Sequence, residues 1–135
     1  MLLNWSNEFN VGIEKIDHQH KELFDRINVL LVAMREGKGK TEVINALNFL
    51  EEYVQKHFSE EEALQKSNNY PKHSIQHEQH EEFKKELIKI REKCEKGGLS
   101  TSIVLELQKR MTDWWRDHII TLDKDMGKFI NSKTE

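Results

Sequence analysis

Apolar residues recur every three or four positions through most of this chain, in four runs separated by polar gaps. The runs cover residues 13–34, 47–64, 76–94 and 104–123. Positions three and four apart lie on the same side of an α-helix, so this spacing is typical of helices that bury one face. No stretch alternates apolar and polar residues over the length of a strand. The sequence therefore predicts an all-α protein.

The gaps between the four runs are short and carry turn signals. Glycines occur in residues 37–40 and 97–98, and Pro71 fits the first turn of a helix better than its interior. Short connections join antiparallel neighbours, which favours an up-down-up-down antiparallel four-helix bundle. The last dozen residues are expected to form a short C-terminal helix that docks on it. At this length, residues 1–135 are expected to form a single domain.

Composition narrows the class of protein. The net charge is −3 with both signs mixed along the chain, so nothing predicts nucleic-acid binding. No run of about 18 apolar residues predicts a membrane span. Residues 1–8 lack the basic and apolar regions of a signal peptide, which favours a cytoplasmic protein. The evenly charged outer faces of the predicted helices favour a monomer.

Polar side chains interrupt the apolar faces at one level of the predicted bundle. They are His20, His57, Glu61, His80, His118 and Asp123. Those of the first and third helices lie near the helix starts, and those of the second and fourth lie near the helix ends. Because neighbouring helices are antiparallel, these positions meet near one end of the bundle. An apolar core is expected to fill the rest.

Taken singly, each of these residues has an ordinary explanation. A lone histidine is most often a surface or core residue, and His57 with Glu61 has the spacing of a common helical ion pair. Buried together, however, such groups lose several kcal/mol of solvation each unless a partner binds them. A metal site explains their recurrence on four helices best.

The donor types indicate which metal is bound. Imidazole and carboxylate suit iron, zinc, nickel or copper, and the absence of thiolates excludes the soft-metal classes. Six donors are too many for one tetrahedral zinc ion. The sequence therefore predicts two metal ions.

The segments around these residues match a known pattern. They are Trp5, residues 12–24 (GIEKIDHQHKELF), residues 57–62 (HFSEEE), Tyr70 with Pro71, residues 80–83 (HEEF) and residues 114–123 (WWRDHIITLD). In order and spacing, the chain resembles the hemerythrin family, and most closely its single-domain bacterial members, the bacteriohemerythrins. The resemblance covers nearly the whole chain.

This resemblance implies reversible O₂ binding for storage, delivery or scavenging, and not an enzyme. The cofactor it implies is a non-haem di-iron centre, two iron ions with an oxo or hydroxo bridge. By resemblance, His20 and His57 hold the iron that takes O₂. His80, His118 and a further histidine hold the other iron.

The resemblance also implies the remaining parts of the site. Glu61 and Asp123 are expected to bridge the two irons. The apolar pocket for O₂ is expected to comprise Phe58, Trp114, Trp115 and Ile119.

The fifth histidine departs from the family pattern. The pattern places it four positions before His80, where this chain has Gln76. We expect His77 to ligate beside His80, with a small rotation or bulge of the helix. The amide oxygen of Gln76 or a water molecule are the alternatives. His73 lies about 10 Å from His80 along the helix axis, too far to bind the same iron.

Two other classes of function remain as alternatives. A di-iron oxidase of the ferritin type needs Glu-x-x-His motifs from two helices, and this chain contains none. Reactivity toward peroxide or nitric oxide would place the protein in this enzyme class. An oxygen-sensing module would act through a partner, since 135 residues leave no room for a fused output domain.

Overall fold

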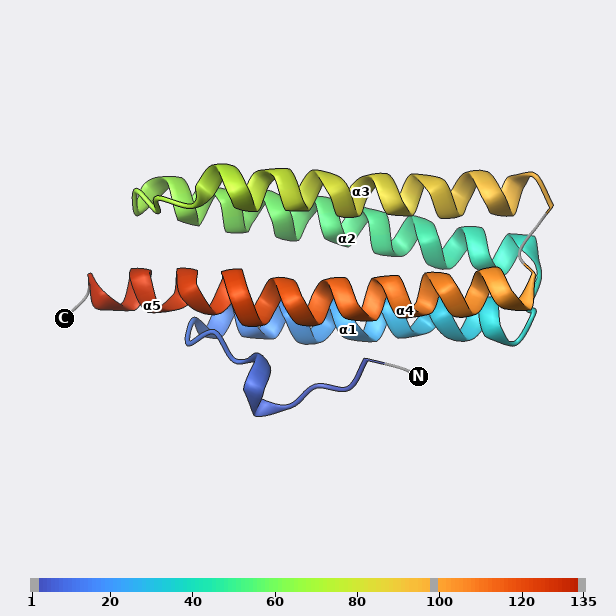
Figure 1. The fold of residues 1–135 in the computed structure, drawn as a ribbon, viewed down its shortest axis with the longest axis horizontal. Coiled ribbons are helices and arrows are strands. Elements are labelled where there is room, and N and C mark those ends of the chain that lie inside the picture. Colours follow the sequence, from blue (N-terminus) through green and yellow to red (C-terminus); the bar gives the residue numbers. More distant parts are fainter. Residues whose placement is uncertain (1–2, 98–99, 134–135) are drawn as a thin grey trace.

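The computed structural model describes residues 3–97 and 100–133, which contain helices and no strand. The four long helices are α1 (Glu14–Arg35), α2 (Lys40–Ser67), α3 (His73–Glu95) and α4 (Thr101–His118). They lie side by side along the long axis of the molecule, and each runs opposite to the one before it (Figure 1). The predicted all-α, up-down-up-down antiparallel four-helix bundle is confirmed.

The buried faces of these helices are the ones predicted from the apolar spacing. Side chains that are nearly inaccessible to solvent include Leu23, Ile27, Leu30, Leu47, Leu50, Val54, Leu87, Ile90, Val104 and Leu107. Burying a side chain of this size stabilises the folded state by roughly 2 kcal/mol, so the apolar faces hold the bundle together. None of the described helices is both long enough and apolar enough to cross a membrane.

Tight turns set the antiparallel arrangement. Gly37 and Gly97 follow α1 and α3 with φ of +61° and +82°, a left-handed conformation that glycine adopts without steric cost. Ser100 caps α4, where its Oγ accepts a hydrogen bond from the backbone N–H of Ile103 at 3.3 Å. Gly98, which was predicted to take part in the turn, lies outside the described residues.

The predicted short C-terminal helix is present, and it continues from α4 without a break. From His118 the chain continues through a π-helical segment, η2 (Ile119–Asp123), directly into α5 (Lys124–Ser132). One helical rod results (Figure 1), because no glycine or proline interrupts the chain between α4 and α5.

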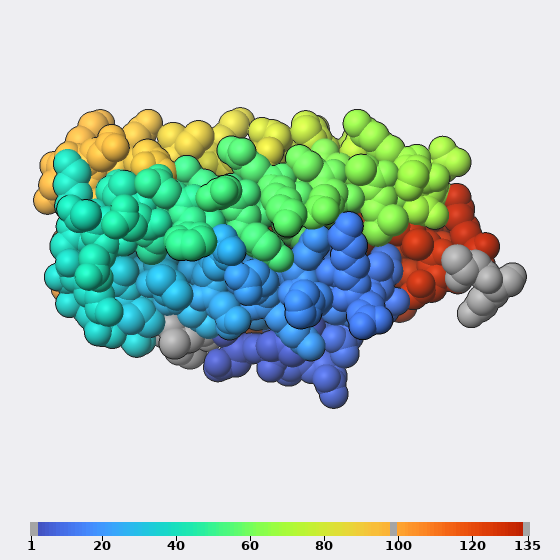
Figure 2. Space-filling view, turned by 180° about the vertical axis from the view of Figure 1, so that it is seen from behind, coloured from blue at the N-terminus to red at the C-terminus, as the bar shows by residue number. Residues whose placement is uncertain are grey.

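A short N-terminal arm, the dark blue segment in Figures 1 and 2, packs along the outside of the bundle and contains the 3₁₀ helix η1 (Asn7–Phe9). Trp5 and Phe9 pack on Phe24 of α1 with ring centroids 5.4 and 5.2 Å apart. Further along the arm, the backbone of Val11 presses against Gly127 of α5, where a Cβ atom would lie 1.9 Å from the Val11 carbonyl oxygen. The arm therefore ties α1 to α5.

Candidate metal centre

Six polar side chains predicted from the sequence come together inside the bundle, toward the end where α4 passes into α5. They are His20, His57, Glu61, His80, His118 and Asp123, and each exposes at most 2% of its surface. Burying charged groups in this way is costly unless they are paired or bind a metal. Among the residues that the structure describes, every buried histidine and carboxylate belongs to this cluster.

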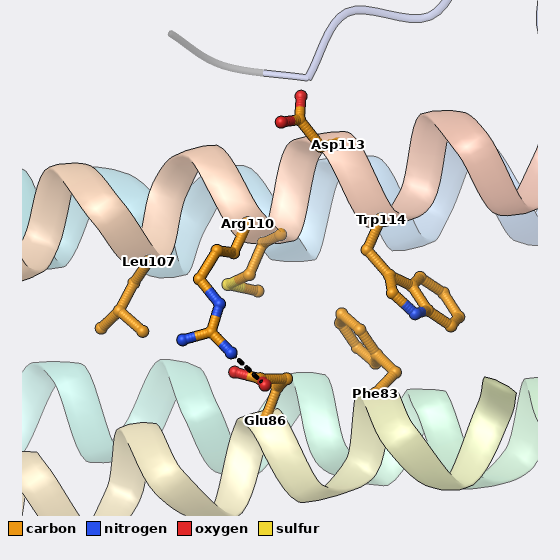
Figure 3. A pocket seen from close by; sticks show the side chains of 7 residues that line it. Phe83, Glu86, Leu107, Arg110, Asp113 and Trp114 are labelled. Atoms are coloured by element: carbon orange, nitrogen blue, oxygen red, sulfur yellow. Dashed lines mark hydrogen bonds and ion pairs between the residues drawn. The ribbon is translucent and has the colours of Figure 1, made fainter.

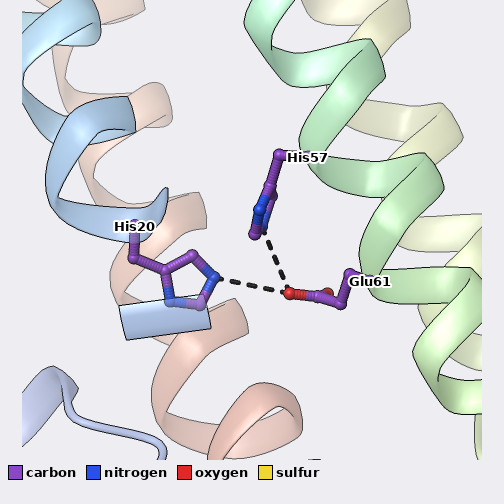
Figure 4. Close-up of side chains that lie close together, drawn as sticks. All are labelled: His20, His57 and Glu61. Carbon is purple, nitrogen blue, oxygen red and sulfur yellow. Dashed lines mark ion pairs between the residues drawn. The ribbon is translucent and has the colours of Figure 1, made fainter. Parts of the chain in front are cut away.

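The cluster divides into two groups of donors that share Glu61. In the first group, Glu61 Oε2 lies 3.2 Å from Nε2 of His57 and 3.5 Å from Nε2 of His20 (Figure 4). In the second group, Glu61 Oε1 lies 3.2 Å from Nε2 of His80, and His118 completes the group. All donor atoms of a group lie within 4.8 Å of one another. Each oxygen of Glu61 thus faces a different group.

Asp123 repeats this arrangement from the opposite side. Its Oδ2 lies 3.2 Å from Nε2 of His20, and its Oδ1 lies 3.2 Å from Nε2 of His118. The π-helical segment η2 makes this possible, because its i→i+5 hydrogen bonds bring residues five apart onto one face. In a regular α-helix the two side chains would point in different directions.

Three of the four histidines donate Nδ1–H to a neighbouring side chain. The pairs are His57 with Oε1 of Gln19 (2.8 Å), His80 with Oε2 of Glu62 (2.9 Å) and His118 with Oε1 of Gln79 (2.8 Å). Because each acceptor is an oxygen, Nδ1 carries the hydrogen, and the lone pair of a neutral imidazole lies on Nε2, which faces the cluster. Outer hydrogen bonds of this kind orient histidines that bind metals.

These outer partners were not predicted from the sequence. A usable signal existed, since each partner is adjacent in the chain to one of the predicted donors. Gln19 precedes His20, Glu62 follows Glu61, and Gln79 precedes His80.

Several polar atoms of the cluster have no aligned hydrogen bond to any residue in the described part of the chain. They are Nδ1 and Nε2 of His20, Nε2 of His57, both oxygens of Glu61, and Oδ2 of Asp123. In addition, the Nε2 atoms of His80 and His118 lie only 3.3 Å apart. Lone pairs that face one another at this distance repel unless a proton or a cation lies between them. The donor set therefore fits metal ions, and its imidazoles and carboxylates suit iron, zinc, nickel or copper.

The electrostatics indicate how the metal-free cluster balances its charges. Burial lowers the pKa of His20, but the carboxylates of Asp123 and Glu61 outweigh burial and raise it to about 9. Burial raises the pKa of Glu61, yet His57 and the other imidazoles hold it well below its usual range. A proton on His20 thus offsets the buried carboxylates, and a bound metal ion would displace that proton.

The structure does not bring His77 to the cluster. Its side chain is 52% exposed, and its Nδ1–H donates to Oε1 of Glu62 at 2.7 Å. Gln76 occupies the inward position instead, where it is fully buried and its Nε2–H donates to Oδ1 of Asp123 at 2.9 Å. The prediction for His77 is corrected, because α3 is regular over its whole length and has no bulge that would turn His77 inward.

Aromatic rings wall the cluster on its apolar side. The ring of Phe58 stacks on His80 with centroids 3.8 Å apart, and Trp115 lies 6.2 Å from His20 and 6.4 Å from His57 by the same measure. Phe58, Trp115 and Ile119 are inaccessible to solvent. These three residues of the predicted O₂ pocket therefore belong to the dry interior.

Trp114, the fourth residue of the predicted pocket, lies at the surface edge. Its ring stacks on His118 with centroids 4.5 Å apart, and it also lines a hollow of about 330 Å³ between α3 and α4 (Figure 3). Apolar walls of the hollow come from Phe83, Leu107 and Met111, and a salt bridge joins Arg110 to Glu86. Trp114 thus separates this hollow from the imidazole of His118 and is only half-buried.

The chain matches the model of a known protein family. The model described as "Hemerythrin HHE cation binding domain" matches residues 11–130. Similar proteins include the bacteriohemerythrin of Stenotrophomonas maltophilia, 30% identical over 87% of this chain and 74% of that protein. The bacteriohemerythrin of Clostridium acetobutylicum is 27% identical over 90% of this chain and 95% of that protein.

Solved structures agree with this match. A crystal structure of wild-type hemerythrin superposes with a TM-score of 0.81 and covers 95% of this chain and 97% of that one, at 24% sequence identity. A point mutant of hemerythrin gives the same TM-score at 25% identity, with 94% and 95% of the two chains covered. At this identity the likeness supports the fold.

Proposed function

The chain belongs to the hemerythrin family, and we propose that its buried cluster holds two iron ions and binds O₂ reversibly. One observation carries this proposal. Glu61 and Asp123 each direct one carboxylate oxygen toward the first group of imidazoles and the other oxygen toward the second group. Two carboxylates in this arrangement are suited to bridge two metal ions.

The proposed roles follow from the two groups of donors. His20 and His57 would hold the iron that takes O₂, and His80 and His118 would hold the other. When bound, the two irons would supply the electrons that O₂ takes up and recover them when O₂ leaves. The Nδ1–H bonds to outer partners keep Nε2 of three histidines aimed at the metal positions.

The apolar wall supports a carrier. Phe58, Trp115 and Ile119 keep water away from the cluster, and a dry site disfavours the escape of charged, reduced forms of oxygen. Water exclusion prevents side reactions in enzyme active sites in the same way. Reversible binding needs such a site, because loss of reduced oxygen would leave the irons oxidised.

Iron analysis combined with absorption spectroscopy tests the proposal. Two irons per chain are expected, with a colourless reduced protein under argon that becomes coloured in air and bleaches again when O₂ is removed. Zinc, a single metal ion or no metal would overturn the di-iron centre. Irreversible colouring with turnover of peroxide or nitric oxide would favour the enzyme alternative instead.

Other features stay predictions from the sequence. They are a single domain over residues 1–135, a monomer, a cytoplasmic location and O₂ as the partner.

A further inference from the structure

Gln76 touches the cluster from inside the bundle. It lies one helical turn before His80 on the same face of α3, and its side chain is fully buried. Its Nε2–H donates to Oδ1 of Asp123 at 2.9 Å. The amide head group therefore reaches an oxygen that is itself part of the cluster.

The amide oxygen of Gln76 has no such partner. Its Oε1 is buried and forms no hydrogen bond with any residue that the structure describes. Gln65 is equally buried but differs, since its Nε2 contacts the sulfur of Met126 and its Oε1 accepts a hydrogen bond from His73. A buried acceptor without a partner is costly. The unpaired oxygen of Gln76 therefore points to a partner outside the chain, such as a bound cation.

The position of this amide assigns it to one of the two donor groups. Oδ1 of Asp123, which Gln76 contacts, is the oxygen that faces His118, whereas Oδ2 faces His20. The two ends of an amide have nearly the same shape, and a half-turn about the terminal bond exchanges oxygen and nitrogen. A cation beside Oδ1 would attract the oxygen, and the carbonyl oxygens of amide side chains are established ligands of hard cations.

We propose that Gln76 is a metal ligand, and that its Oε1 binds the iron held by His80 and His118. The inference rests on the proposed function, because it assigns a residue to one of the two metal positions. It gives the chain an oxygen donor where the family pattern has a histidine. The two positions then differ in donor set, since Gln76 lies beside only one of them.

A titration of metal-free protein with Co²⁺ alone tests this assignment without any measurement of O₂ binding. Calorimetry gives the two affinities, and the absorption of Co²⁺ reports its coordination. The variants are Gln76→Leu, which removes the donor, and Gln76→Glu, which keeps an oxygen but cannot donate a hydrogen bond. Gln65→Leu is the matched control, because it removes a buried amide whose hydrogen bonds go to Met126 and His73 and not to the cluster.

We expect Gln76→Leu to weaken binding of one Co²⁺ by at least about tenfold, the lower end of what even outer partners cost, and to leave the other unchanged. Gln76→Glu should bind both ions at least as tightly as the parent. Gln65→Leu should bind both with parental affinity. If the leucine variant does not fold, Gln76→Met preserves the length of the side chain and serves in its place.

Two results would overturn the assignment of Gln76 as a ligand while leaving the proposed two-metal centre in place. Parental binding of both ions by Gln76→Leu would mean that Gln76 has no part in the site. Weakening in Gln76→Leu and Gln76→Glu alike would mean that Gln76 only donates its hydrogen bond to Asp123. A parent protein that fails to bind two Co²⁺ ions would instead overturn the proposed centre, and the assignment with it.

Discussion

The imidazole of His118 and the carboxylate of Asp123 meet at 3.2 Å although they lie five positions apart in the chain. Their contact depends on the π-helical segment η2 between them. Residues three and four apart are neighbours on an α-helix, whereas a π-helix brings residues five apart together, and such segments are frequent at functional sites. A local change of helix type therefore supplies the second shared carboxylate of the cluster.

Changing the length of η2 should test its role. Deletion of Thr121 makes the spacing of His118 and Asp123 four, which a regular α-helix places on one face. Insertion of an alanine after Thr121 makes the spacing six, which neither helix type places on one face. We expect the deletion variant to retain two irons per chain and the insertion variant to hold fewer, as measured by iron analysis. Circular dichroism of both variants controls for folding. Equal iron contents would contradict a role for the π-helical segment.

The bundle and its six donors could be predicted because both depend on which face of a helix is buried. His57 and Glu61 continue the face that Leu50 and Val54 begin, and all four are buried. The same reasoning identifies Gln76 as the inward residue of α3. His77 is expected only because the family pattern calls for a fifth histidine and position 76 holds Gln76, and this expectation is wrong because one residue along a helix turns a side chain by about 100°.

Other parts of the site could not be predicted in this way. The segment of η2 has no glycine or proline, so no local signal distinguishes a π-helix from an α-helix there. Gln19, Glu62 and Gln79 flank the buried faces, and the apolar spacing does not say which flanking residue meets which imidazole. Those contacts depend on the distance and rotation between helices, which only the packed bundle determines.

Because Glu61 faces both donor groups, Glu61→Gln should lower the affinity for both metal ions. His118→Leu should lower the affinity for only one of the two ions. We expect losses of roughly tenfold or more in affinity, since outer partners alone contribute 10–100-fold, and titration with ferrous iron under argon measures them. Glu52→Gln is the matched control, because it removes the same charge from an exposed position of the same helix. Parental affinity for either ion in Glu61→Gln would contradict the sharing of this carboxylate.

His77 and Glu62 should have different effects on metal binding. His77→Ala should retain both irons and change the free energy of unfolding by no more than about 0.5 kcal/mol, as for most exposed side chains. Glu62→Gln removes the charge of the carboxylate that accepts the Nδ1–H of His80. We expect this variant to bind one of the two irons roughly 10–100-fold more weakly. Metal analysis after dialysis against a chelator compares the two. Loss of an iron from His77→Ala would restore His77 as a ligand.

Gly127→Ala should destabilise the protein, although alanine is favoured over glycine inside a helix by about 1 kcal/mol. The new Cβ atom would lie 1.9 Å from the carbonyl oxygen of Val11, so the N-terminal arm would have to move away from α5. We expect a loss of roughly 1–3 kcal/mol in the free energy of unfolding, the usual cost of overpacking, measured by urea denaturation. The exposed neighbour provides the control, Lys128→Ala, which should stay within about 0.5 kcal/mol of the parent. A variant at Gly127 as stable as the parent would show that the arm does not pack tightly there.

Without metal, the protein should lose stability as the pH rises from about 6.5 to about 9. Burial lowers the pKa of His20, but Asp123 and Glu61 raise it from 6.5 to about 9 in the folded protein. The pKa of His80 is raised as well, since Glu61 outweighs its burial. The folded state therefore binds protons more tightly than the unfolded state, so this stabilisation is complete below pH 6.5 and disappears as the pH passes the folded pKa.

For His20 the effect is on the order of a few kcal/mol, and urea denaturation of metal-free protein at several pH values in this window measures it. The metal-loaded protein is the control, because a metal-bound imidazole has no proton to lose in this range. Its stability should not follow this decline, and it should release its metal in acid instead, when protons compete for the imidazoles. A metal-free protein of constant stability across the window would show that His20 does not carry the proton that offsets Glu61 and Asp123.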